Sequence, residues 1–327
     1  MNQFDNNKFL IVKAKGGMGN RMLCAATGIL YGQVTNRKTI VDWRDVSYSN
    51  DGSNTFTKFF SCASVYPETI LPSKGTIRPS VWVNNLDKSM NEMVQKYDPN
   101  KHSSIWIHQK YSIDVRKLDY GEDIVVFWYY TGRIKKIKRH LHDNRDGFAD
   151  LDTNGIIHKM LTEQMRISES IRRRIDEFKA KRWPEKVIGI HIRYTDRKTN
   201  LAAYEKYLNR FLKLSPHAHI FLATDSQQIN QEYKMRFKNV FSTPKWFPEN
   251  RAAMHQNISC PDKVANGIEA LVDMYLLAQC DYLIYPGCST FSWISRILSN
   301  ASSKNIVDID RFNIKVRSKR LIRELVA

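Results

Sequence analysis

The chain has 327 residues, of which 42% are hydrophobic, enough to build the cores of about two ordinary domains, so a disordered protein is excluded. Its formal net charge is +18, which favours anionic partners such as phosphates, nucleic acid or acidic membranes without choosing among them. No run reaches the ~18 apolar residues of a membrane span, and residues 1–7 do not resemble an export leader. The cysteines are odd in number, dispersed and without a CxxC pair, so we expect no disulfide framework, no zinc site and a cytoplasmic location (Cys24, Cys62, Cys260, Cys280 and Cys288).

The first part of the chain predicts a β-α-β unit. Residues 9–13 (FLIVK) predict a strand, a glycine cluster predicts a tight loop, and apolar residues from Met22 to about residue 36 have helical spacing. Residues 38–43 (KTIVDW) predict a second strand, so a parallel sheet begins here. Residues 47–99 show no regular pattern. Later strands of the same half are predicted at 105–107 and 124–130.

A second alternation of strands and helices follows from about residue 160 and predicts a second α/β domain. The predicted helices cover 168–182, 203–214 and 267–279, with two more beginning at Ser226 and Thr290; the predicted strands cover 187–192, 218–223, 282–285 and 306–309. We therefore expect domains over 1–160 and 161–327, with a cleft between them. Ligands of open α/β sheets bind beyond the carboxyl ends of the strands, so the residues that follow each strand are the candidates for a site.

The loop at 15–21 (KGGMGNR) is the first such candidate. Its three glycines would let backbone amides approach a phosphate or a sugar. The GGxG spacing is not that of a dinucleotide-binding or P-loop motif. A tight turn explains the glycines equally well, and Asn20 can simply cap the following helix.

The segment 191–197 (HIRYTDR) directly follows a predicted apolar strand. An arginine there can bind a diphosphate through two N–H groups and stabilise the charge on a departing phosphate. A solvated loop with internal Arg–Asp pairing is the alternative. After the next strand, Thr224, Asp225 and Ser226 are candidates for a ligand contact or, just as well, for a helix cap.

Two candidates lie near the end of the chain. Asp273 is a lone carboxylate in an otherwise apolar helix (EALVDMY), so it needs hydrogen-bond donors, either local groups or the N1 and N2 hydrogens of a guanine. Ser289 and Thr290 open a helix, where hydroxyls, backbone amides and the helix dipole favour a phosphate; capping is the alternative.

Together and in this order, these blocks resemble the superfamily of α1,2-, α1,6- and protein O-fucosyltransferases. Its HxRxxD signature is present as His191, Arg193 and Asp196. The segments KTIVDWRDVSY, FLATDS, PKWFPENRA and EALVDMYLLAQC are similar to the bacterial nodulation-type α1,6-fucosyltransferases. The resemblance covers most of the chain. It implies a GT-B-like fold of two Rossmann-like domains with parallel sheets facing a cleft, GDP-fucose as donor, inversion at the anomeric carbon and no metal or other cofactor.

The resemblance also implies roles for individual residues. Arg193 matches the essential arginine on the GDP phosphates, and Asp196 and Arg197 lie where an acceptor would bind. The remaining residues match positions that bind the donor. Gly17, Gly19 and Asn20 match the loop beside the donor sugar, and His191 and Asp273 match the guanine contacts. Ser289 and Thr290 match the diphosphate contacts, and Asp225 is an acid at a strand end on the donor side. The N-terminal domain would then be the acceptor side and the C-terminal domain the GDP-fucose-binding side.

The sequence departs from the family pattern at two positions. Tyr194 replaces the second arginine of the HxRRxD form, and Leu201 stands where the eukaryotic α1,6 enzymes have a catalytic glutamate. Glu205 is the substitute that we select as catalytic base, and an exposed acid at a helix start is its alternative reading. The segments GGMGN and STFSW resemble the α1,2 enzymes more closely. The linkage therefore stays open between α1,6 to GlcNAc of a chitin-type oligosaccharide and α1,2 on a surface polysaccharide or lipopolysaccharide glycan.

A nucleic-acid-binding protein is the rival from a different class. Basic clusters motivate it, but no aromatic interleaving, zinc spacing or recognition helix accompanies them, and we predict no nucleic-acid partner (clusters at 133–139, 172–174 and 317–323). The expected partners are GDP-fucose and an oligosaccharide acceptor. The basic C-terminal tail, which carries Ile314, Val316 and Leu321, predicts either peripheral contact with an anionic membrane or a docked helix.

Overall fold

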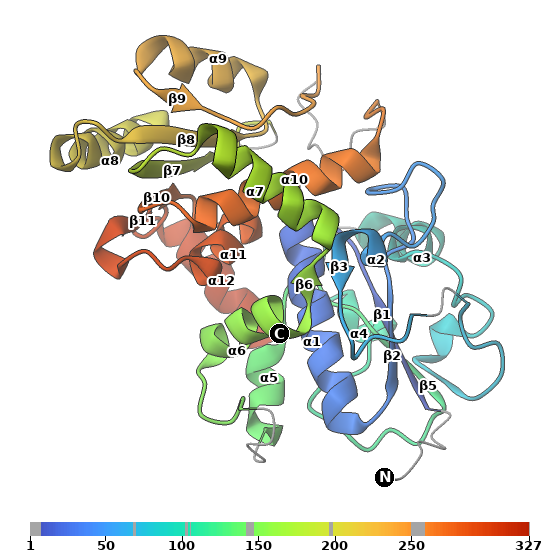
Figure 1. Ribbon diagram of the computed structural model, residues 1–327. Coiled ribbons are helices and arrows are strands. Elements are labelled where there is room, and N and C mark those ends of the chain that lie inside the picture. The colour runs from blue at the N-terminus through green and yellow to red at the C-terminus, as the bar shows by residue number, and fades with distance from the viewer. Residues whose placement is uncertain are drawn as a thin grey trace. The chain divides into compact units, whose positions relative to one another are not determined.

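The structure is a computed structural model that describes residues 8–67, 70–101, 104, 106–141, 147–195, 199–249 and 259–326 (Figure 1). It divides into two compact units, one of residues up to Ile167 with the last residues from Leu325, and one of residues Ser168–Glu324. The sequence analysis placed the division near residue 160.

The first unit is built on a four-stranded parallel sheet. Its strand order is β2-β1-β5-β4, with β1 in the interior of the sheet (β1 Phe9–Lys13, β2 Lys38–Asp42, β4 Ile77–Arg78, β5 Ile124–Phe127). Helix α1 (Met18–Thr35) packs on β1 and β2. The helix approaches the strand closely because Gly28 has no side chain: a Cβ there would meet Cγ2 of Val12 at 2.4 Å.

Two sequence predictions for this unit need correction. Helix α1 begins at Met18 rather than Met22, because the loop already ends at Gly16, whose φ of +84° turns the chain, and Gly17 is extended. The strand predicted at 105–107 is wrong at its two described residues, since Trp106 and Ile107 form a turn that leads into α4 (His108–Tyr111); Ile105 lies outside the described residues. This short apolar run directly precedes a helix and does not adopt an extended conformation.

The stretch over 47–99, which showed no regular pattern, contains several short elements. The longest is α3 (Met90–Tyr97), which begins with a capping box in which Ser89 and Glu92 each bond the other's backbone N–H. Strand β3 pairs antiparallel with β6, which lies at the end of the unit. The remaining short elements are α2 Phe56–Phe59, β3 Phe60–Ser61, 3-10 turns at Ser80–Trp82, Pro99–Lys101 and Lys138–His140, α5 Ile134–Ile137, α6 Thr153–Lys159, a π turn Met160–Gln164 and β6 Arg166–Ile167.

The second unit contains a five-stranded parallel sheet of order β11-β10-β7-β8-β9. Its strands are β7 Val187–Ile192, β8 His219–Thr224, β9 Val240–Phe241, β10 Tyr282–Tyr285 and β11 Ile306–Asp308. Its helices are α7 Glu169–Arg182, α8 Leu201–Leu214, α9 Gln227–Arg236, α10 Lys263–Ala278, α11 Thr290–Leu298 and α12 Ile314–Val326, with a 3-10 turn at Ser303–Asn305.

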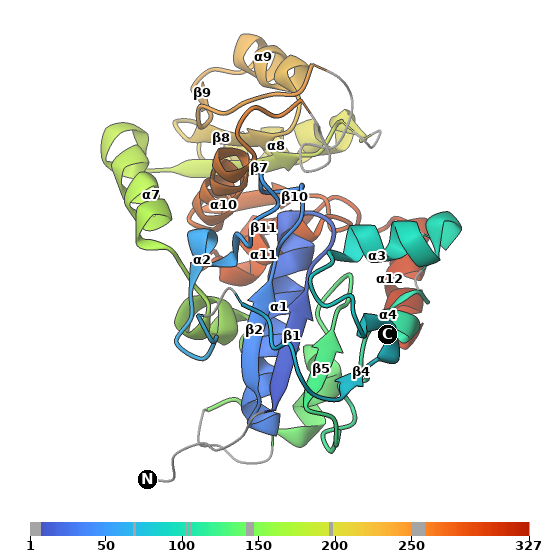
Figure 2. The same cartoon turned by 90° about the vertical axis from the view of Figure 1, so that its right-hand side faces the viewer.

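Helices cover both faces of this second sheet (Figures 1 and 2). On one face Ile188, Ile190 and Ile192 form a buried cluster with side chains of α8 and α9. On the other face α7, α10 and α11 pack together, and Gly189 of β7 lies against Leu277 and Cys280 at the end of α10. Two parallel sheets in an α/β arrangement were predicted from the alternation of apolar strands and amphipathic helices, and this fold class is confirmed. Among the residues that the structure describes, no helix is long and apolar enough to cross a membrane.

Candidate nucleotide-binding site

The order of strands in the second sheet locates a candidate site. From β7 the chain proceeds to β8 and β9 on one side, and then returns to place β10 and β11 on the other side of β7. Connections leave in opposite directions from the β7–β10 pair, and in parallel sheets the space beyond the carboxyl ends at such a point is where ligands bind. His191 and Arg193 lie at this end of β7, Asp225 follows β8, and Ser289 follows β10.

His191 is held neutral by its surroundings. The residue is 8% exposed, and its ring centroid lies 4.7 Å from that of Phe291 in α11. Burial, together with the positive charges of Arg193 and Lys245, lowers the pKa of His191 to about 3. Its buried Nδ1 has no hydrogen-bond partner within the described protein. A neutral imidazole with an unsatisfied nitrogen can bind a polar ligand group.

The backbone that carries Arg193 is fixed on both sides. Asp225 accepts hydrogen bonds from the backbone N–H of Tyr194 (2.7 Å) and of Thr195 (3.3 Å), and from the Thr195 hydroxyl (2.7 Å). Thr199 Oγ1 donates to the carbonyl oxygen of Arg193 at 2.6 Å. Arg193 itself is half-buried. Asp225 therefore fixes the conformation of the loop that carries Arg193.

Asp273 has the donors that its burial requires. Its carboxylate, on the inner part of α10, accepts a hydrogen bond from Thr243 Oγ1 at 2.5 Å and forms an ion pair with Lys245. One helical turn earlier, Glu269 accepts from the backbone N–H of Trp246 at 3.3 Å, and burial raises the pKa of its carboxyl group. Both carboxylates thus fasten residues 243–246 onto α10. The structure thus gives Asp273 local donors, one of the two alternatives that the sequence left open.

The sequence analysis missed Thr243 and Lys245. Both precede Asp273 by about thirty residues and belong to a different element, so nothing in their spacing indicates contact. The only signal available was the demand of a lone buried carboxylate for a nearby cation or hydroxyl.

The start of α11 has the properties of an anion-binding site. Ser289 is the N-cap residue and is 2% exposed, yet its side chain does not cap the helix and its Oγ has no partner in the described protein. The preceding loop is fixed from β11 and the turn after it: Asp308 accepts from Gly287 N at 2.7 Å, and Asp310 accepts from Cys288 N at 3.0 Å. Backbone amides, a helix dipole and an unsatisfied hydroxyl meet here, with Thr290 as the first helical residue.

Glu205 lies in the first turns of α8 and is held by Arg236 of α9. Both guanidinium nitrogens take part, with N···O distances of 2.7 and 2.9 Å to the two carboxylate oxygens. This geometry favours the reading of Glu205 as a helix acid in an ion pair over its reading as a catalytic base.

Of the remaining predicted site residues, some lie in the first unit and the others lie outside the described residues. Gly17 precedes α1 in an extended conformation, and Gly19 and Asn20 lie in its first turn, so the glycine loop ends in the uncapped start of this helix. Asp196 and Arg197 lie outside the described residues. In the described part of the chain no group of three or more His, Cys, Asp or Glu side chains is placed to hold a metal ion.

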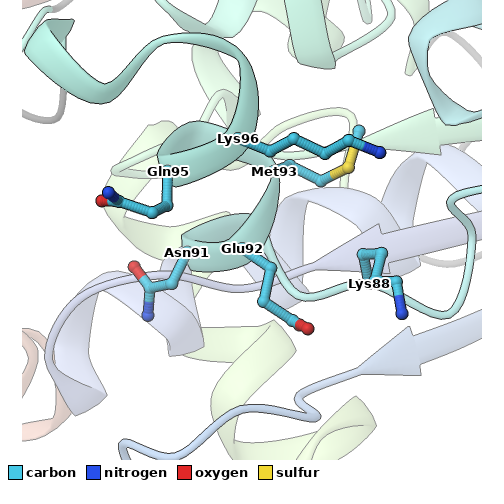
Figure 3. A pocket seen from close by; sticks show the side chains of 6 residues that line it. All are labelled: Lys88, Asn91, Glu92, Met93, Gln95 and Lys96. Atoms are coloured by element: carbon cyan, nitrogen blue, oxygen red, sulfur yellow. The ribbon is translucent and has the colours of Figure 1, made fainter.

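The first unit also contains a cavity of about 580 Å³ beside α3 (Figure 3). Figure 3 shows its lining, which comes from α3 and from Lys88, two residues before the helix, and includes none of the predicted site residues (Lys88, Asn91, Glu92, Met93, Gln95 and Lys96).

Comparison with known proteins agrees with this architecture. A nodulation protein Z from Azorhizobium caulinodans is 23% identical over 323 residues, which cover 88% of this chain and 89% of that protein. The nodulation protein Z of Bradyrhizobium diazoefficiens is 24% identical over 327 residues, covering 90% and 80%. A NodZ α1,6-fucosyltransferase co-crystallized with GDP superimposes with a TM-score of 0.58 at 22% identity, covering 89% of this chain and 92% of that one. The same values hold for that enzyme soaked with GDP-fucose.

The fold places the chain in the class of α/β proteins with two parallel sheets to which these fucosyltransferase structures belong. The family model for Nodulation protein Z (NodZ) matches residues 152–317, which is half of the chain. The chain belongs to the NodZ family. The family expected from the sequence, that of the bacterial nodulation-type enzymes, is therefore confirmed.

Proposed function

We propose that this protein transfers L-fucose from GDP-fucose to a hydroxyl group of a glycan, with inversion at the anomeric carbon and without a metal ion. One observation carries the proposal. At the switch point of the second sheet, a fixed loop carries Arg193 after β7, and the adjacent parallel strand β10 leads to a helix start where the buried Ser289 hydroxyl has no partner in the described protein. An arginine and a helix N-terminus are suited to a diphosphate.

The proposed reaction is a direct displacement. The acceptor oxygen forms a bond to the anomeric carbon of fucose on one face while the bond to the β-phosphate oxygen breaks on the other, and the acceptor proton passes to a base. Negative charge grows on the β-phosphate. Arg193 and the amides at the start of α11 stabilise that charge. Ser289 and Thr290 hold the diphosphate.

We assign the other predicted residues to the rest of the donor site and to the acceptor side. His191 and Asp273 contact the guanine, and Asp225 supports the donor site through the Arg193 loop. In the first unit, Gly17, Gly19 and Asn20 border the donor sugar, and this unit supplies the acceptor side. Asp196 and Arg197 complete the acceptor side.

For the acceptor we propose GlcNAc of a chitin-type oligosaccharide with an α1,6 linkage, supported by the resemblance to the NodZ α1,6 enzymes. An α1,2 transfer to a surface polysaccharide or lipopolysaccharide glycan is the second candidate. The segments GGMGN and STFSW favour it, since they resemble the α1,2 enzymes.

The test is calorimetric titration with GDP and GDP-fucose in EDTA, followed by transfer assays on chitin oligosaccharides and NMR of the product. We expect saturable binding in EDTA and a fucosylated product. Binding without transfer to chitin oligosaccharides would reject that acceptor. No binding of GDP at any concentration would overturn the proposed function.

A further inference from the structure

Asp273, which the proposed function places against the guanine, forms a buried ion pair with Lys245. Their side chains are 3% and 6% exposed, so both charges are nearly out of water. A buried ion pair of this kind costs desolvation energy that a packed apolar pair would not. Stability alone is therefore a weak explanation for it.

Two buried polar atoms without a partner in the described protein lie on the elements next to this pair, one on β7 and one on α10. The unpartnered Nδ1 of His191 belongs to a ring whose pKa the Lys245 charge lowers, so the two groups are electrostatic neighbours. Asn266, two turns before Asp273 on the same face of α10, is 4% exposed and has an unpartnered Oδ1. Buried polar atoms without partners point to a ligand that supplies them.

The hydrogen-bonding capacity of the pair is only partly used. An ionised carboxylate offers about four acceptor positions, and Thr243 and Lys245 occupy one on each oxygen of Asp273. An ammonium has three donors, and Asp273 takes one of those of Lys245. Side by side, the pair offers a charged donor next to a charged acceptor.

This pattern matches one edge of guanine and opposes that of adenine. Guanine presents the O6 acceptor beside the N1 and N2 donors, whereas adenine presents an amino donor in place of O6 and an acceptor at N1. We propose that Lys245 is a specificity-determining residue that donates to O6 while Asp273 accepts from N1 and N2. The inference rests on the proposed function, because it assigns the base subsite of the same nucleotide.

The experiment compares dissociation constants for GDP, IDP and ADP. Hypoxanthine keeps O6 and the N1 hydrogen but lacks the 2-amino group, so IDP separates the two contacts. The variants are Lys245→Met, which removes the charge and the donors, and Lys245→Gln, which keeps an amide donor. Lys186→Met is the matched control, since Lys186 forms an exposed ion pair with Asp281 in the same unit.

We expect Lys245→Met to weaken GDP and IDP by the same factor, roughly tenfold to a hundredfold, and ADP by less than threefold. Lys245→Gln should fall between that variant and the wild type, and Lys186→Met should match the wild type. Thermal melting shows which variants fold. If Lys245→Met does not fold, the nucleotide preference of Lys245→Gln tests the inference in its place.

An unchanged GDP-to-ADP preference in Lys245→Met would overturn the inference, whether the three nucleotides bind as they do to the wild type or are all weakened by one factor. Uniform weakening is the mark of a purely structural counter-ion. Failure of the proposed function is a separate result, because the wild type would then not bind GDP.

Discussion

At the scale of single residues, His191 links burial to pH dependence. Its pKa of about 3 in the folded protein lies below the ordinary histidine value of about 6.5. Between these values the unfolded chain binds a proton that the folded chain does not, so stability is complete above pH 6.5 and is lost as the pH falls towards 3. His191→Gln should reduce the slope of unfolding free energy against pH by about 1.4 kcal/mol per pH unit in this window.

Urea unfolding of both proteins at pH 5, 6 and 7.5 measures that slope. If the unfolding free energy of wild type and variant depended on pH in the same way, the imidazole would take up its proton in the folded state. His191 would then not be a neutral ligand-binding group.

Arg193 belongs to the chemical step of the proposed function. Arg193→Ala removes a donor to the developing phosphate charge, which typically costs about 3 kcal/mol, so kcat should fall by ~10² or more. Arg193→Lys should also be slow, because an ammonium cannot reproduce the two-pronged contact of a guanidinium. Arg172→Ala is the control, since Arg172 is an exposed residue paired with Glu169 on α7. Wild-type turnover in Arg193→Ala would remove Arg193 from the mechanism.

Glu205 can be assigned by comparison with its ion-pair partner. Because Arg236 occupies both of its oxygens, we expect Glu205→Gln and Arg236→Gln to lower kcat by similar small factors, within about threefold of each other. The measurement is steady-state fucose transfer by the two variants. A loss of a hundredfold or more confined to Glu205→Gln would instead identify this carboxylate as the base.

At the scale of elements, the site depends on the close approach of β7 to α10. A Cβ at Gly189 would lie 2.7 Å from Sγ of Cys280 and 3.2 Å from Leu277, so Gly189→Ala forces the strand and the helix apart. We expect a loss of about 1–3 kcal/mol in unfolding free energy, measured in urea, with weaker GDP binding because His191 lies two residues further along β7. Gly121→Ala, where the added carbon meets nothing within 4 Å, should be neutral. Equal stability of the two variants would contradict this packing.

The elements also show what the sequence can and cannot predict. Strands β7, β8 and β10 of the second sheet followed from apolar runs bounded by polar turns, since they are buried on both faces. The two-residue, half-buried strand β9 at the edge was not predicted. The helix α3 was missed although Ser89 and Glu92 form a capping box and Met90, Met93 and Val94 have helical spacing. Its eight residues are fewer than the roughly 11–18 over which such a period is recognised. Residues at strand ends were predictable as candidates, whereas the Lys245–Asp273 contact depends on packing between distant segments, which local patterns do not encode.

At the scale of the whole molecule, the charge of +18 is combined with an exposed apolar surface near the C-terminus. Phe312 and Ile314, at the start of α12, are 76% and 77% exposed, and Leu321 and Ile322 are also exposed. Ile314 and Leu321 are seven residues apart and so share one face of the helix; Arg317, between them in the sequence, lies on the same face, and Lys315 lies off it. Apolar side chains beside basic ones suit a surface of anionic lipid.

We therefore predict that the protein sediments with phosphatidylglycerol vesicles and not with phosphatidylcholine vesicles, and that the double variant Ile314→Asp, Leu321→Asp stays in the supernatant. GDP binding should be the same in both proteins, because neither residue belongs to the candidate nucleotide site. If net charge alone attracted the protein to the vesicles, the double variant, still strongly basic, would sediment almost as well as the wild type. A DNA duplex would then compete with the vesicles for both proteins at low salt. Retention of the variant on anionic vesicles would thus assign the effect to the charge of the whole surface, and α12 would lose its role as a membrane contact.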